Sequence, residues 1–67
     1  MKPYSTIRVM DVYKNPMTAS EWLVTGKNDE EKLVQLVLMT ASGDSQPIWK
    51  RNTDRVFSFP QVQVGVE

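Results

Sequence analysis

The chain has 67 residues, 40% of them hydrophobic, and eight Lys and Arg residues balance eight Asp and Glu residues to a formal net charge of zero. This length supports one hydrophobic core, so we expect one small domain over residues 1–67. A neutral chain is not expected to be a strongly basic nucleic-acid or membrane-surface binder. The absence of Cys and His excludes disulfides, thiolate nucleophiles, thiolate or imidazole metal sites and histidine acid–base catalysis.

No segment is apolar over the length that a signal sequence or a membrane span requires, because Arg8 and Asp11 interrupt the first apolar stretch. Together with the lack of Cys, which agrees with a reducing compartment, this predicts a cytoplasmic protein. We expect no metal and no cofactor.

The composition favours strands. Nine Val, two Ile and five Thr outnumber two Ala and four Leu, and β-branched side chains pack well on pleated surfaces. Turn-forming residues divide the chain into short pieces. The pieces predict five short strands and a possible sixth at the C-terminal end: Ile7–Tyr13, Glu21–Thr25, Leu33–Thr40, Ile48–Arg51, Val56–Phe59 and Val62–Val66.

The first two pieces show partial alternation. Ile7 and Val9 flank Arg8 in the first, and Trp22 and Val24 share one side of the second. The connection between these pieces contains Thr18–Glu21, which matches a capping box and could begin one short helical turn.

The third piece is apolar on both faces apart from Gln35, as expected of a central strand. An α+β fold with a helix near Asp29–Ala41 is the alternative. Asn28 or Asp29 would cap that helix, Gly43 would follow its end, and Leu33, Leu36 and Val37 would form an apolar stripe.

The remaining pieces complete an all-β order. An irregular connection is followed by a hairpin across Gly26–Lys32, a second hairpin across Ala41–Asp44, a polar turn at Asn52–Arg55 and a last strand. This succession resembles the SH3-like small barrels, and the resemblance covers most of the chain. It predicts a small SH3-like barrel of about five short antiparallel strands. The proline-binding aromatic set of SH3 domains is not identifiable, so no function follows from the fold.

Catalytic chemistry has no convincing candidate. Asp29, Glu30 and Glu31 would alternate at a hairpin tip and remain solvated, Ser42 and Ser45 have no histidine to activate them, and no glycine-rich phosphate motif is present. We expect the protein not to be an enzyme.

Two features are typical of binding. Trp49, Lys50, Arg51 and Arg55 combine an indole with three cations within seven residues, a combination with which small barrels bind single-stranded nucleic acid. The same residues could instead fill and cover the core. The second feature is a surplus of aromatic and methionine side chains, including Tyr13 and Met17, which a small core cannot bury completely. Exposed residues of these types mark protein contacts.

The sequence therefore predicts a small non-enzymatic binding module, a protein-interaction regulator or accessory factor. Its candidate partner-binding residues are Trp49, Lys50, Arg51, Arg55, Tyr13 and Met17. The alternative is a nucleic-acid-binding small barrel that uses the Trp49–Arg55 segment. A third hypothesis is self-association through residues 61–67, an extra strand or tail in which Val62, Val64 and Val66 alternate with polar residues and Gly.

Overall fold

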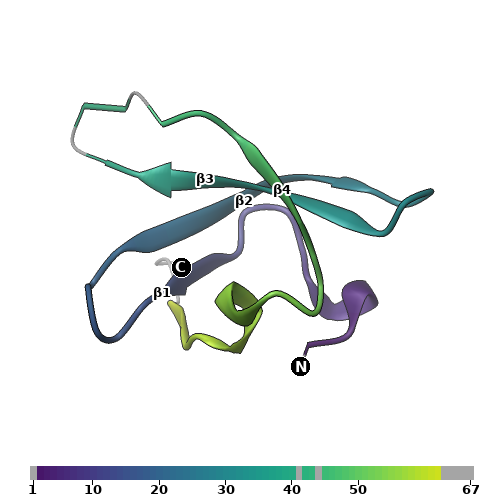
Figure 1. Ribbon diagram of the computed structural model, residues 1–67, viewed down its shortest axis with the longest axis horizontal. Coiled ribbons are helices and arrows are strands. Elements are labelled where there is room, and N and C mark those ends of the chain that lie inside the picture. The colour runs from purple at the N-terminus through teal and green to yellow at the C-terminus, as the bar shows by residue number, and fades with distance from the viewer. Residues whose placement is uncertain (1, 41, 44, 63–67) are drawn as a thin grey trace, which may run out of the picture.

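A computed structural model describes residues 2–40, 42–43 and 45–62 of the chain. The five strands are antiparallel and form one sheet in the order β4-β3-β2-β1-β5 (Figure 1). Two short 3₁₀ turns, η1 and η2, accompany the sheet. In chain order the elements are η1 (Tyr4–Thr6), β1 (Val12–Lys14), β2 (Glu21–Asn28), β3 (Leu33–Met39), β4 (Ile48–Arg51), η2 (Arg55–Ser58) and β5 (Gln61–Val62).

The predicted all-β class is confirmed, and the alternative helix near Asp29–Ala41 is wrong. Leu33–Met39 is a strand that pairs with β2 on one side and with β4 on the other. Val34 and Leu36 are fully buried on one face of this strand, and Leu33 and Val37 are half-buried on the other, so no single helical stripe accounts for its apolar residues. The sheet is not a closed barrel, because β4 and β5 are its two edges and no pairing joins them in the described residues.

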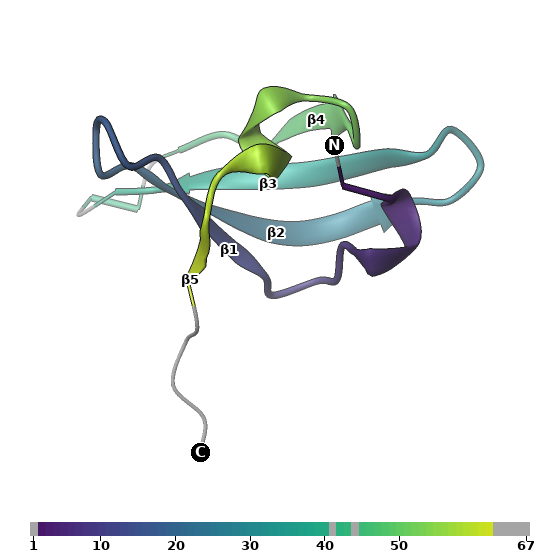
Figure 2. The ribbon, with the colours of Figure 1, turned by 90° about the horizontal axis from the view of Figure 1, so that it is seen from below.

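One face of the sheet, which we call the inner face, carries the core. Val24 pairs directly with Leu36, and both are fully buried on this face together with Val34. In Figure 2, η2 lies over the sheet, and its residues Val56 and Phe57 belong to the core on the inner face. The core cluster consists of Ile7, Tyr13, Val24, Val34, Leu36, Val56 and Phe57.

The predicted strand Val56–Phe59 is wrong, because this segment forms η2. The Asp54 carboxylate accepts a hydrogen bond from the Val56 backbone N–H at 3.1 Å, which satisfies a free donor at the start of the turn. Neighbouring strand residues point to opposite faces, yet Val56 and Phe57 are both buried. The turn allows both side chains to cover the inner face.

The predicted strand Ile7–Tyr13 is too long, since only Val12–Lys14 is strand. A turn precedes it, in which the Asp11 N–H donates to the Arg8 carbonyl at 3.1 Å and Met10 has a left-handed φ of 82°. Ile7 still reaches the core, whereas Val9 is exposed.

A β-bulge in β2 changes which side chains face inward. The register shifts between Val24 and Gly26, so that Lys27 pairs with Val34 on the inner face. The Lys27 ammonium donates to the carbonyls of Tyr4 and Ile7, at 3.0 and 2.6 Å. The bulge thereby lets β2 hold the N-terminal segment against the end of the sheet.

At the C-terminal end, Val62 of β5 pairs with Val12 of β1. The remainder of the predicted strand Val62–Val66, with Val64 and Val66, lies outside the described residues. No helix in the described part of the chain has the length and apolar character needed to cross a membrane.

We expect Tyr13→Phe to stabilise the protein. The Tyr13 hydroxyl is buried with no partner at hydrogen-bond geometry, although the Asp11 carboxylate lies near enough to act on its pKa. An unsatisfied buried hydroxyl costs ~1–3 kcal/mol, so its removal should raise the free energy of unfolding in urea by about 1 kcal/mol. Tyr4→Phe is the matched control. The Tyr4 hydroxyl donates to the Asp29 carboxylate at 2.7 Å, and its loss should lower stability. A destabilised Tyr13→Phe protein would contradict this account of the core.

Tyr4 and Tyr13 should ionise at a higher pH than a tyrosine in an unfolded chain. Burial, followed by the negative charge of Asp11, raises the pKa of Tyr13 from 10.0 to about 12. The pKa of Tyr4 is also raised to about 12, by desolvation and by the Asp29 carboxylate. An ultraviolet titration of the folded protein should therefore show no tyrosinate near pH 10, unlike the protein in denaturant. Because the unfolded chain loses these protons first, their contribution to stability falls as the pH rises from 10 towards 12. Tyrosinate absorbance near pH 10 in the folded protein would contradict the prediction.

Candidate functional site: a groove between the sheet and η2

A groove with a volume of about 600 Å³ opens on the inner face of the sheet, between the β1–β2 loop, β4 and η2. This volume lies within the ~300–1,000 Å³ that binding pockets occupy. The lining is mainly apolar, from Pro16, Met17, Trp22, Leu36, Ile48, Val56 and Phe59, with polar groups from Asn15, Lys50, Asp54 and Arg55.

The β1–β2 loop forms one wall. The Asn15 side chain accepts from the Met17 N–H at 2.9 Å, and the Asn15 carbonyl accepts from the Ala19 N–H at 2.7 Å. Ala19 takes a left-handed φ of 64° to close the loop. This tight turn replaces the helical start that the capping-box pattern suggested, and it places Met17 on the rim, where 90% of the residue is exposed.

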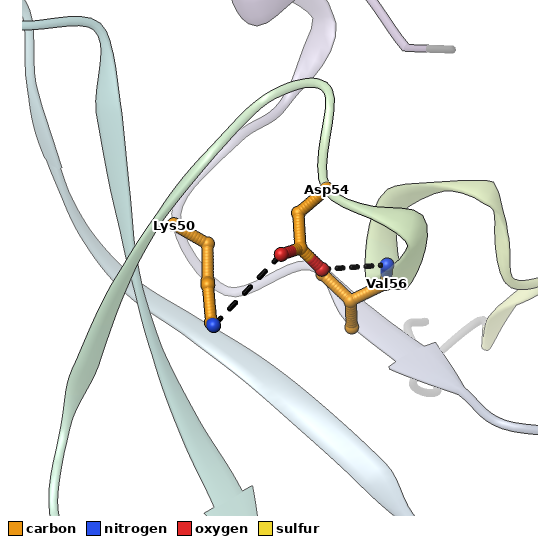
Figure 3. Close-up of polar contacts among 3 residues, drawn as sticks. All are labelled: Lys50, Asp54 and Val56. Carbon is orange, nitrogen blue, oxygen red and sulfur yellow. Dashed lines mark hydrogen bonds and ion pairs between the residues drawn. The ribbon is translucent and has the colours of Figure 1, made fainter.

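The opposite wall is organised by Asp54. One carboxylate oxygen caps η2 through the Val56 N–H, and the other lies 3.9 Å from the Lys50 ammonium (Figure 3). Arg55 follows directly in η2 and also lines the groove. The rim therefore carries two cations and one carboxylate that is already engaged.

Three of the predicted binding residues meet at this groove. Lys50 pairs with the core residue Val34 across the sheet, so it faces inward, and Met17 and Arg55 reach the groove from the loop and from η2. Met17 thus shares one surface with Lys50 and Arg55, which follow it by 33 and 38 positions in the sequence.

The other three lie elsewhere. Trp49 pairs with Gln35 and Arg51 with Leu33, so both point to the outer face of the sheet. Trp49 is 47% exposed there. Tyr13 is fully buried in the core, where its ring meets Phe57 edge-on at 5.4 Å, and we leave it out of the site.

Sequence reasoning missed several groove residues. Trp22 and Ile48 were not among the predicted binding residues; they pack against the core as partly buried side chains and also line the groove. Asp54 was not among the predicted binding residues either. A cap signal could have identified its role, since an Asp at the start of a turn accepts from the backbone N–H two residues later.

Comparison of the chain with protein-family models, with curated proteins and with solved structures finds no match. Among the described residues, no three acidic side chains lie close enough together to hold a metal ion. The groove offers an apolar floor, two cations and a side-chain amide.

Asp54→Ala should lower the free energy of unfolding by about 1 kcal/mol, the usual cost of losing an N-cap. Asp54→Asn keeps an oxygen that can accept from the Val56 N–H and removes only the charge opposite Lys50. An exposed ion pair contributes ~0–1 kcal/mol, so the Asn variant should remain near the wild type in urea denaturation. Equal losses in the two variants would show that the charge, rather than the cap, stabilises η2.

Proposed function

We propose that this protein is a non-enzymatic module that binds a partner polypeptide in the groove between the sheet and η2, as a regulator or accessory factor in the cytoplasm. The observation that carries the proposal is the convergence of Met17, Lys50 and Arg55 on one mainly apolar groove. An apolar floor with a few charged groups at the rim is the usual composition of a binding site.

The charges favour one kind of partner. Lys50 and Arg55 contribute two positive charges, and the Asp54 carboxylate, which accepts from the Val56 N–H and lies 3.9 Å from the Lys50 ammonium, contributes one negative charge. The rim therefore keeps an excess of positive charge, which Arg55 supplies. A segment with apolar side chains and a nearby Asp or Glu would complement this rim.

We further propose that the fold is an open member of the SH3-like small barrels. Two successive hairpins, the turn η2 and the final strand β5 follow one another in the chain. This order supports the resemblance suggested by the sequence, although in residues 2–40, 42–43 and 45–62 no pairing joins the edges β4 and β5, which leaves the sheet open.

The nucleic-acid alternative is less well supported. Base stacking on an aromatic ring together with phosphate contacts requires the ring and the cations on one surface. Trp49 shares the outer face with Arg51, one of the three cations, whereas Lys50 and Arg55 line the groove on the other face. The zero net charge adds no long-range attraction for a polyanion.

Selection of short random peptides on the immobilised protein tests the proposal. We expect enrichment of peptides that combine apolar residues with Asp or Glu. Met17→Gln should weaken binding of an enriched peptide about tenfold, equivalent to ~1.4 kcal/mol. Met10→Gln is the matched control, because Met10 is also exposed but does not line the groove.

A second matched pair tests the charge. Arg55→Gln should weaken binding of the same peptide, whereas Arg8→Gln, at an exposed position that does not line the groove, should leave binding unchanged. No enrichment, or equal effects of Met17→Gln and Met10→Gln, would contradict the proposal. Binding of a single-stranded oligonucleotide that weakens steeply with salt would instead favour the nucleic-acid alternative.

A further inference from the structure

The strand β4 has a free edge. It is the terminal strand of the sheet and pairs only with β3 among the described residues. An edge strand presents unpaired backbone N–H and C=O groups along its outer side, which can pair with another extended chain. The free run is short, because Pro47 precedes β4 and the Arg51 carbonyl already accepts from the Asp54 N–H at 2.9 Å.

The groove lies along the same strand. Ile48 and Lys50 project from β4 into the groove, and the close-up shows Lys50 directed towards Asp54 in front of η2 (Figure 3). On the other face of β4, Trp49 is 47% exposed. A chain lying beside β4 would thus meet the apolar groove on one face and an indole on the other.

We propose that the partner binds as an added β-strand along the free edge of β4. This inference rests on the proposed function and names the form of the bound segment. Alternate side chains of an extended strand point to opposite faces. Every second partner residue would enter the groove, with an Asp or Glu near Lys50 and Arg55, and the residues between would pack on Trp49. Backbone hydrogen bonds to β4 would supply affinity and the pockets would supply selectivity.

Strand addition also explains how predicted binding residues on opposite faces of β4 could contact one partner. Trp49 and Arg51 lie on one face of β4 and Lys50 on the other, so no compact ligand on a single face would contact all three. A strand at the edge would contact both faces. A proline-rich segment fits less well, because a polyproline II helix does not pair with a sheet edge and repeats every three residues.

The second edge of the sheet is a weaker candidate. Its strand β5 has two residues in the described part of the chain and follows Pro60. None of the residues that line the groove comes from β5. The combination of free backbone groups with an adjacent groove is therefore found at β4.

Two single-tryptophan variants separate the groove from the edge. In Trp49→Phe the remaining Trp22 reports on the groove, and in Trp22→Phe the remaining Trp49 reports on the edge. Titration with an enriched peptide should shift the fluorescence of both and protect both from a soluble quencher. A change at Trp22 without a change at Trp49 would overturn strand addition and leave the proposed function standing. No change at either would contradict both.

Backbone methylation of the peptide tests the same inference on the wild-type protein, which avoids any loss of stability from Trp22→Phe. N-methylation removes one hydrogen-bond donor at a time. We expect about a tenfold loss of affinity at every second position, as one backbone hydrogen bond is worth up to about a factor of ten, and smaller losses between. Equal effects at all positions, or losses at every third position, would overturn strand addition.

Discussion

A single sheet of short strands must bury its inner face with segments that are not strands, and this constraint determines the rest of the structure. η2 supplies Val56 and Phe57, and the Phe57 ring meets Tyr13 edge-on at 5.4 Å with an interplanar angle of 88°. One helical turn is too short to cover the whole face. The uncovered part, between η2, β4 and the β1–β2 loop, is the groove. The short turn η2 therefore explains both how the core is covered and why a groove remains beside it.

The other end of the inner face is covered by the N-terminal segment. The bulge after Val24 turns Lys27 inward, where its ammonium binds two backbone carbonyls and lies 4.1 Å from the centre of the Tyr4 ring. Carbonyl oxygens and an aromatic face are suitable partners for a partly buried cation. Through this one-residue bulge, Lys27 of β2 contacts Tyr4 of η1 and joins the sheet to the N-terminal segment.

The sequence predicted strands well where a short piece lay between turn-forming residues: the predicted strands Leu33–Thr40 and Ile48–Arg51 are found as Leu33–Met39 and Ile48–Arg51. The sequence prediction was wrong where a local interaction sets the backbone conformation. The hydrogen bond to the Asp54 carboxylate favours a turn over a strand at Val56–Phe59. The left-handed φ of Met10 shortens the first strand. For the site, alternation along β4 could have separated Trp49 from Lys50. The approach of Met17 and Arg55 to Lys50 depends on the tertiary packing of a loop and a turn, which no local pattern encodes.

The account centres on β4 as a strand whose free edge and adjacent groove receive one extended partner. Amide hydrogen exchange of this strand, with and without a peptide enriched on the protein, tests that claim most directly. The account predicts that backbone amides within Ile48–Arg51 that do not pair with β3 exchange quickly in the free protein and slowly in the complex. Unchanged exchange along β4, with protection confined to another part of the molecule, would contradict it.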